Sequence, residues 1–395
     1  MLFGRLLFFL AVSTPLLHSS AISVVVTPFH NETQAADLNW IGESVSETIM
    51  TELSAAGQLV LDRDTREEGY KQLDIKPDAQ LTKATLFKLG QTIDASMICY
   101  GSYQIILPSP NAQPRDGSIR ISARFLDLRK LRDASEFTET GKLTDLSRLE
   151  EHMAWQCLRF LDPATQTTPE QLLIPSKLIR VDAKESYTRG LLAASPEQKQ
   201  KWFETAIKLD SHYTEPAFEL GKLAMERKSY RQAEAWFSKI PQSDPLYLQA
   251  KFKMGLSSYL SGDYTTAKAC FQDLAKQTPL DEVFNNLGAA ESRLNEPAAL
   301  DDFQRALNGD KADPTYNFNY AIALYRQGKY EDAIPHLKAV IDRTGSDDAT
   351  ASLLSRCEQR IAPQPGTRTW PAERLKDNFD LSAFRQLKAV LQSAH

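Results

Sequence analysis

The sequence lacks the short motifs on which most enzyme active sites are built. It contains no G-x-S-x-G, no G-x-x-x-x-G-K-[ST] and no G-x-G-x-x-G, and its six histidines form no H-E-x-x-H. No two of its four cysteines have the spacing of zinc ligands. We therefore expect a protein that is not an enzyme and that has no catalytic residues, no bound metal and no cofactor.

A large net charge and long apolar runs are missing as well. The formal charge is -5 over 395 residues, so nucleic acid is not an expected partner. Residues 6–17 form an apolar run of about 12 residues, well short of the ~20 that span a bilayer. No later segment is long and apolar enough to cross a membrane, and no transmembrane segment is expected after processing.

The early apolar run has the form of a secretory signal. Arg5 precedes it, and the small residues Ser19, Ser20 and Ala21 follow it. We expect a signal peptide over residues 1–21, cleaved after Ala21, and a soluble exported product. A membrane anchor is the alternative, which the short run disfavours. The cysteine nearest to the cleavage site is Cys99, so a lipoprotein is not expected.

Four cysteines in an exported chain could form two disulfides, with three possible pairings. Cys99 lies in a strand-like run, whereas Cys157, Cys270 and Cys357 lie on apolar faces of separate expected helices. Unpaired and buried cysteines are therefore the expectation.

Residues 22–162 mix strand and helix patterns. Runs rich in β-branched residues alternate with runs whose apolar residues recur every three or four positions. This order predicts an α+β domain with a mixed sheet and covering helices. Strands are expected at residues 22–29, 58–62, 96–107, 118–128 and 134–143, and helices at residues 37–56, 81–93 and 145–161.

Short motifs in this domain resemble the family shared by the amino-terminal domain of TolB and the curli-secretion protein CsgG. They are Thr27-Pro28-Phe29, Asn31, Thr33, Trp40, Glu43-Ser44, Leu59-Val60-Leu61-Asp62-Arg63, Cys99-Tyr100-Gly101-Ser102 and residues 119–127. The resemblance implies a bacterial envelope location, hence a periplasmic protein, and it implies no catalytic residues. TolB carries a β-propeller after this domain, and the repeated blades of a propeller are not found here.

Two polar stretches in this domain have ordinary explanations. Residues 31–33 fit the glycosylation pattern, but an asparagine after a strand more often caps the following loop. Residues 62–64 are a mixed charge run, which we interpret as a solvated turn.

A linker over residues 163–179, rich in Pro, Thr and Gln, is expected to be extended and solvated. Beyond it the sequence repeats every 34 residues. The pairs that show this period are Gly221 and Gly255, Ala233 and Ala267, Phe237 and Phe271, Pro245 and Pro279, Ala299 and Ala333, Phe303 and Leu337, and Ala306 and Val340.

The period and the residue types resemble the tetratricopeptide repeat, a helix pair with small residues where its helices touch and a proline at the closing turn. A single pair cannot bury its apolar face alone, so the pairs must stack. We expect an all-α superhelical solenoid over residues 180–361, with four clear repeats and one degenerate repeat.

In such repeats the first helix of each pair lines the concave surface. Alignment on Gly221, Gly255, Gly288 and Ala321 places aromatic, amide and guanidinium side chains there, which suit an extended or helical peptide. An alternative for the phenylalanines is packing between consecutive helices. The candidate partner-binding residues are Phe218, Phe252, Tyr259, Asn285, Asn286, Arg293, Phe318, Asn319, Tyr325 and Arg326.

Residues 362–395 form a tail in which residues 380–392 are expected to be an amphipathic helix. Its expected role is to cap the open end of the solenoid, since terminal repeats need a cover. A second possibility is that it lies in the groove and competes with a ligand.

These features favour a soluble adaptor or scaffold of the bacterial cell envelope, which binds protein or peptide ligands in the groove and an envelope complex through its first domain. An accessory subunit of an outer-membrane secretion or transport apparatus is the alternative, suggested by the CsgG resemblance. A purely structural repeat protein is a third possibility.

Overall fold

The computed structural model describes residues 22–388, apart from residues 34, 77–78, 110–111, 113–115, 173–177, 364–370, 382–383 and 386–387. The expected signal peptide lies outside the described residues. Within them, no helix has both the length and the apolar character that crossing a membrane requires.

The N-terminal part contains a mixed sheet. Its strands lie in the order β3-β1-β4-β5-β6, with β2 beside β4. Strands β1 and β3 are parallel, as are β1 and β4, whereas β4, β5 and β6 run antiparallel. The bounds are β1 (Ser23–Val26), β2 (His30–Asn31), β3 (Leu59–Val60), β4 (Met97–Ile106), β5 (Ser118–Asp127) and β6 (Arg132–Lys142).

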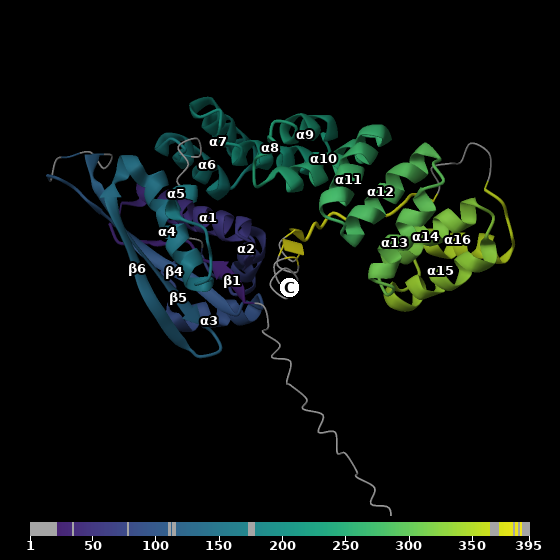
Figure 1. The fold of residues 1–395 in the computed structure, drawn as a ribbon, viewed down its shortest axis with the longest axis horizontal. Helices are drawn as coiled ribbons and strands as arrows, with labels where there is room; N and C mark the ends of the chain where they lie inside the picture. The colour runs from purple at the N-terminus through teal and green to yellow at the C-terminus, as the bar shows by residue number, and fades with distance from the viewer. Residues whose placement is uncertain are drawn as a thin grey trace, which may run out of the picture.

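Helices cover the two faces of this sheet unequally (Figure 1). Helices α1 (Trp40–Ala55) and α4 (Leu146–Leu161) pack on one face, where the alternating residues of β5 are buried with them in the main core. Helix α3 (Lys83–Thr92) covers part of the other face through a smaller apolar cluster. The outer face of β5 therefore stays partly open.

Helix α2 (Arg63–Gln72) corrects the interpretation of residues 62–64 as a solvated turn. Asp62 is its N-cap and accepts a hydrogen bond from the Thr65 amide at 2.8 Å. Arg63 donates to Glu43 at 2.7 Å. Asn31 does cap its loop, as expected, because its Oδ1 accepts the Thr33 amide at 2.9 Å.

Helix pairs follow and arch away from the sheet (Figure 1). Within a pair the two helices pack closely, and the second helix also packs on the first helix of the next pair. The linker holds the short helix α5 (Pro169–Leu172), which contacts α4, so it is not wholly extended. The bounds are α6 (Val181–Leu192), α7 (Pro196–Leu209), α8 (Glu215–Glu226), α9 (Tyr230–Phe237), α10 (Tyr247–Ser261), α11 (Tyr264–Gln277), α12 (Asp281–Leu294), α13 (Ala299–Gly309), α14 (Pro314–Arg326), α15 (Tyr330–Thr344) and α16 (Asp348–Glu358).

The periodic glycines are explained by a close approach within each pair. A Cβ added to Gly221 would lie 2.4 Å from the ring of Phe237, and one added to Gly288 would lie 2.9 Å from the ring of Phe303. The aromatic ring of the second helix thus fills the space that a side chain on the first helix would need. This contact accounts for the two columns that recur together in the sequence.

The first helix pair is fixed to the N-terminal domain. Lys184 of α6 donates to Glu150 of α4 at 2.5 Å, and both side chains are buried. Arg189 donates to the Asp37 carbonyl at 2.7 Å. The chain therefore enters the repeats from a defined position on the sheet domain.

All four cysteines are buried and free, as expected. Cys99 of β4 and Cys157 of α4 lie side by side, a contact that the sequence did not predict. Their hydrogen bond and burial raise the pKa of the Cys99 thiol.

Candidate functional site

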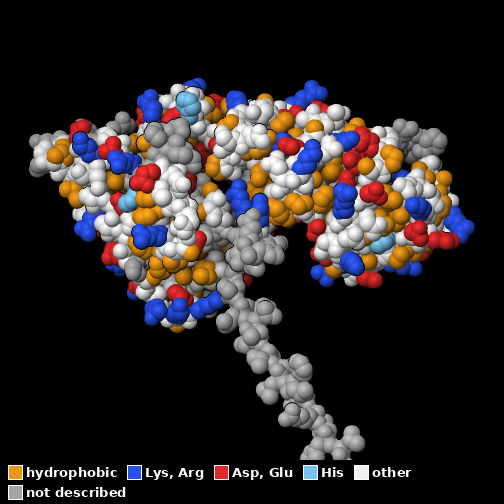
Figure 2. Space-filling model, viewed as in Figure 1, with side chains coloured by type: hydrophobic (Ala, Val, Ile, Leu, Met, Phe, Trp, Pro, Cys, Tyr) orange, Lys and Arg blue, Asp and Glu red, His pale blue; other side chains and the backbone are white. Residues whose placement is uncertain are grey.

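The first helices α10, α12 and α14 turn one face towards the hollow of the arch. In the space-filling view the N-terminal domain and the last repeats form two lobes with this hollow between them (Figure 2). Asn285 and Asn286 of α12 and Asn319 of α14 lie on this face, and each is 0% exposed. Such amides need hydrogen-bond partners because burial without them is costly.

The partners come from the chain's own tail. Residues 371–381 leave the α14–α16 end and cross α12 towards α10 as a drawn-out segment (Figure 1). We call this segment the groove strand, although it forms no strand of the sheet. It runs opposite to the order of the repeats, since Pro371 contacts α14 and Phe379 contacts α10.

The asparagines bind the backbone of the groove strand. Asn319 accepts the Arg374 amide at 2.8 Å and donates to the Arg374 carbonyl at 2.7 Å. Asn286 makes the same two bonds with Lys376, at 2.9 and 2.7 Å. Because the residues bound in this way are two apart, the segment must be extended between them.

Asn285 links the two amides on either side of it. Its Nδ2 donates to the Arg374 carbonyl at 3.0 Å, and its Oδ1 accepts from Asn319 at 2.7 Å. A chain of buried amides therefore spans two successive repeats. Every hydrogen bond from these asparagines to the groove strand uses main-chain atoms, which any sequence offers.

One side chain of the groove strand meets a charged pocket. The carboxylate of Glu373 is 0% exposed and lies between Arg293 of α12, at 2.5 Å, and Arg326 of α14. Tyr259 and Ser292 donate to it at 2.9 and 2.7 Å. Burial opposes its ionisation, but Arg326 and Arg293 outweigh this and hold the pKa of Glu373 below its ordinary value.

An aromatic contact lies at the other end. The rings of Phe379 and Phe252 stack with centroids 4.7 Å apart and planes 7° apart. Leu375 also packs against the cluster that contains Phe252. These contacts bury apolar surface of the groove strand on α10 and α12.

Between the Glu373 pocket and the Phe379 contact, the basic side chains of Arg374 and Lys376 pair with acidic residues. The guanidinium of Arg374 lies 3.6 Å from the ring centroid of Phe318 and donates to Asp347 at 2.6 Å. Lys376 pairs with Asp313 at 2.5 Å. The groove thus offers a positive pocket for residue 373 and a negative edge for residues 374 and 376.

The structure brings most of the predicted groove residues together on the groove strand. Phe252, Tyr259, Asn285, Asn286, Arg293, Phe318, Asn319 and Arg326 all contact it. The two others pack against helices instead, Phe218 half-buried and Tyr325 buried. Phe218 packs against Phe237 with centroids 5.6 Å apart, and Tyr325 packs beside Tyr330 within the α14–α16 cluster.

The tail does not lie where a terminal cap was expected. Helix α16 packs on α15 at that end of the repeats. Leu381 is 2% exposed, and Arg385 donates to the Ser54 carbonyl at the end of α1. Much of the expected helix over residues 380–392 lies outside the described residues.

Several residues of the site were not selected from the sequence. Asp313, Asp347 and Thr350 hold the basic side chains, and Lys253 donates to the Asp377 carbonyl at 2.9 Å. The acidic residues lie at helix N-termini, where capping explains them equally well. Their second role becomes visible only once the groove strand is in place.

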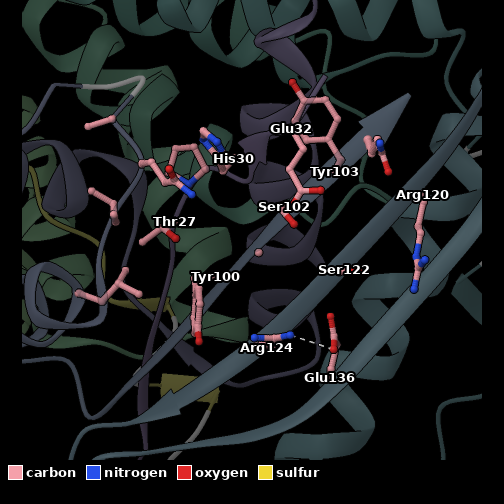
Figure 3. A pocket seen from close by; sticks show the side chains of 17 residues that line it. Thr27, His30, Glu32, Tyr100, Ser102, Tyr103, Arg120, Ser122, Arg124 and Glu136 are labelled. Atoms are coloured by element: carbon pink, nitrogen blue, oxygen red, sulfur yellow. Dashed lines mark hydrogen bonds and ion pairs between the residues drawn. The ribbon is translucent and has the colours of Figure 1, made fainter. Parts of the chain in front are cut away.

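A cavity of about 390 Å³ lies on the open face of the sheet. Figure 3 shows Arg120, Ser122 and Arg124 of β5 along it, with Glu136 of β6 beside them. Arg124 donates to Glu136 at 3.0 Å, and both side chains are 44% exposed. These two charges are satisfied by each other. In the described ranges, no group of His, Cys, Asp and Glu residues is arranged to hold a metal ion.

Comparison with known proteins identifies the later helix pairs. Two family models described as tetratricopeptide repeat match residues 249–280 and 295–349. The chain therefore contains tetratricopeptide repeats. No curated protein matches the chain.

Several solved structures are similar to part of the chain. MamA (residues 41 to the end) from Desulfovibrio magneticus RS-1 is 19% identical over 42% of this chain and 97% of its own, with a TM-score of 0.39. YrrB, titled a TPR protein with an unusual peptide-binding site, is 16% identical over 45% and 92%, with a TM-score of 0.39. PilF from Pseudomonas aeruginosa is 19% identical over 45% and 83%, with a TM-score of 0.39.

Proposed function

We propose that this protein is a non-enzymatic scaffold whose repeats form a superhelical solenoid and bind protein or peptide partners along its concave face. The observation that carries this proposal is the bidentate pairing of Asn319 and Asn286 with the backbone of residues 374 and 376. Main-chain atoms of a helix or sheet are already paired, so such amides select a segment that is extended.

The buried charges support the same function. Arg293 and Arg326 approach one another from successive repeats and share one carboxylate. A core seldom places two guanidinium groups together, because each carries a large desolvation cost. On a surface that binds a carboxylate of a ligand, two neighbouring guanidinium groups are favourable because both can pair with that carboxylate.

The place of action is the bacterial cell envelope, in this proposal. The signal over residues 1–21 and the resemblance of residues 22–162 to the TolB and CsgG family support an exported, periplasmic scaffold whose first domain docks on an envelope complex. The intact mass of the native product tests export: a mass that includes residues 1–21 contradicts cleavage.

Affinity capture from the native envelope, followed by mass spectrometry, tests the binding function. Asn319 and Arg326 also hold the groove strand, so capture is compared in a background in which Glu373→Ala and Phe379→Ala remove that segment's two side-chain contacts. In this background, adding Asn319→Ala and Arg326→Ala should lose groove partners, with a loss of about 1 to 3 kcal/mol in binding free energy. Asn308→Ala with Arg343→Ala is the matched control, because it removes the same residue types at exposed positions of α13 and α15.

The result also separates the alternatives. Partners lost from the groove variant and kept by the control support the scaffold. Equal capture by both folded variants moves the binding surface away from the groove. Recovery of an outer-membrane secretion apparatus, independent of the groove, favours the accessory-subunit alternative.

A further inference from the structure

The groove strand meets the repeats as a peptide ligand would. Its side chains at positions 373, 375 and 379 enter the groove, whereas those of Ala372, Asp377 and Asn378 are exposed. Contacts of this kind are concentrated in a few residues, as at the hot spots of an interface. The exposed positions between them add length without adding selectivity.

We propose that the groove strand is a built-in competitor, that is, a segment of the chain that occupies the groove in place of an external ligand. The external ligand is an extended segment with the same pattern: a carboxylate, an aliphatic residue two positions later and an aromatic residue six positions later. This inference rests on the proposed function. It adds the chemistry of the partner and the way the groove is kept occupied until that partner arrives.

The carboxylate is the first requirement. If the groove strand leaves, Arg293 and Arg326 lose the carboxylate that they share. A replacing segment without a carboxylate would remove that shared partner from two neighbouring guanidinium groups, both largely buried, and this is costly. An acidic residue at this position is therefore selected by repulsion as well as by attraction.

The aromatic residue is the second requirement. Phe252 is 0% exposed with Phe379 stacked on it, so removing Phe379 uncovers its face. The distance along the ligand is fixed, because the asparagines hold residues 374 and 376 in an extended form between the two pockets. A ligand with a different spacing cannot fill both pockets at once.

Basic residues beside the carboxylate are favoured by the negative edge. Asp347 and Asp313 bind Arg374 and Lys376, and each of these four side chains is partly accessible to solvent. Exposed pairs of this kind contribute little energy but fix register and partner choice. We expect them to tune the ligand rather than define it.

Tethering explains how a short segment can hold the groove. A segment joined to the repeats through the same chain has an effective concentration of about 1 mM, so even a weak segment occupies its site. An external ligand must displace the groove strand. The apparent affinity of that ligand is therefore the intrinsic affinity multiplied by the fraction of molecules whose groove is free. Weakening the groove strand should therefore strengthen external binding by roughly 10- to 100-fold.

The test uses the mature full-length chain and a fluorescent synthetic peptide of residues 371–381. Glu373→Ala with Phe379→Ala loosens the groove strand in the protein and leaves every helix of the groove intact. Asp377→Ala with Asn378→Ala is the matched control, since both side chains are exposed. Binding is measured by fluorescence anisotropy, and folding is checked by circular dichroism.

The peptide should bind the loosened protein roughly 10- to 100-fold more tightly than the wild type or the control. Adding Arg326→Ala to the loosened protein should weaken this binding, because the peptide's carboxylate loses one of its two guanidinium partners. A peptide with the Glu373 and Phe379 substitutions should bind none of them. Equal affinity for the wild-type and the loosened protein contradicts the proposal that the groove strand is a competitor.

Other outcomes separate this inference from the proposed function. If scrambled peptides bind the loosened protein as tightly as the native one, the groove binds backbone alone: the pattern is overturned and the scaffold stands. If no extended peptide binds the folded, loosened protein, the scaffold proposal fails too. A wild-type dimer that dissociates in the loosened variant, seen by light scattering, assigns the groove strand to a second copy and overturns the built-in competitor.

Discussion

Asn319 pairs with Arg374 through both main-chain groups of that residue, at 2.8 and 2.7 Å, as a neighbouring strand would. A side chain on a helix thus replaces the edge of a sheet. The arrangement binds a peptide by features common to all sequences, and it leaves the choice of sequence to the pockets on either side.

The Asn319→Ala variant should weaken docking of the groove strand. Removing the amide breaks both bonds and costs about 1 to 3 kcal/mol locally, because the Arg374 amide loses its partner. Hydrogen exchange should show that amide exchanging roughly 5- to 100-fold faster. Asn308→Ala, at an exposed position of α13, should change nothing. Equal protection of Arg374 in both variants would mean that other contacts fix the tail.

The columns of the repeat were predictable because they follow from helix packing. Gly221 and Phe237 recur together since one occupies the space the other leaves, and the same alignment located Asn285 and Arg326. The groove strand was not predictable, because an extended segment has no periodicity and its contacts are distant in sequence. Helix α2 was missed because its buried face includes Arg66, a residue that usually marks a surface.

The buried pair of Arg66 and Glu43 provides a second prediction. Arg66 is 1% exposed, so Glu43→Ala leaves a buried charge without its main partner and should cost about 3 to 5 kcal/mol. Chemical denaturation measures the loss. Adding Arg66→Met removes the stranded charge and should recover part of it. Glu136→Ala, which breaks an exposed pair, should cost less than about 1 kcal/mol. A double variant no more stable than the single one would contradict this explanation.

Gly221 provides a third prediction, on packing within a helix pair. The Cβ of Gly221→Ala would lie 2.4 Å from the ring of Phe237, which is buried, so the ring or the helix must move. Overpacking of this kind costs about 1 to 3 kcal/mol. Thermal unfolding measures it. The smaller side chain in Gly221→Ala with Phe237→Leu should relieve the clash, so the two changes should be less than additive. Strict additivity would show that the two positions do not share this space.

Glu47 makes stability depend on pH. Burial, then the carboxylate of Glu43 and, more weakly, that of Glu219 raise the pKa of Glu47 to about 8. Arg66 and Arg63, each 3.9 Å away, oppose this rise without cancelling it. Between its ordinary value near 4.5 and about 8, the folded protein keeps a proton that the unfolded chain has lost. Stability should therefore fall as pH rises through this window, by up to about 1.4 kcal/mol per pH unit. The pKa of Glu43 is lowered, so its own contribution changes only in acid, below its ordinary value near 4.5.

Glu47→Gln should remove most of the decline and be the more stable protein at pH 8. Chemical denaturation from pH 5 to pH 8 measures both proteins, and parallel curves would show that Glu47 ionises normally.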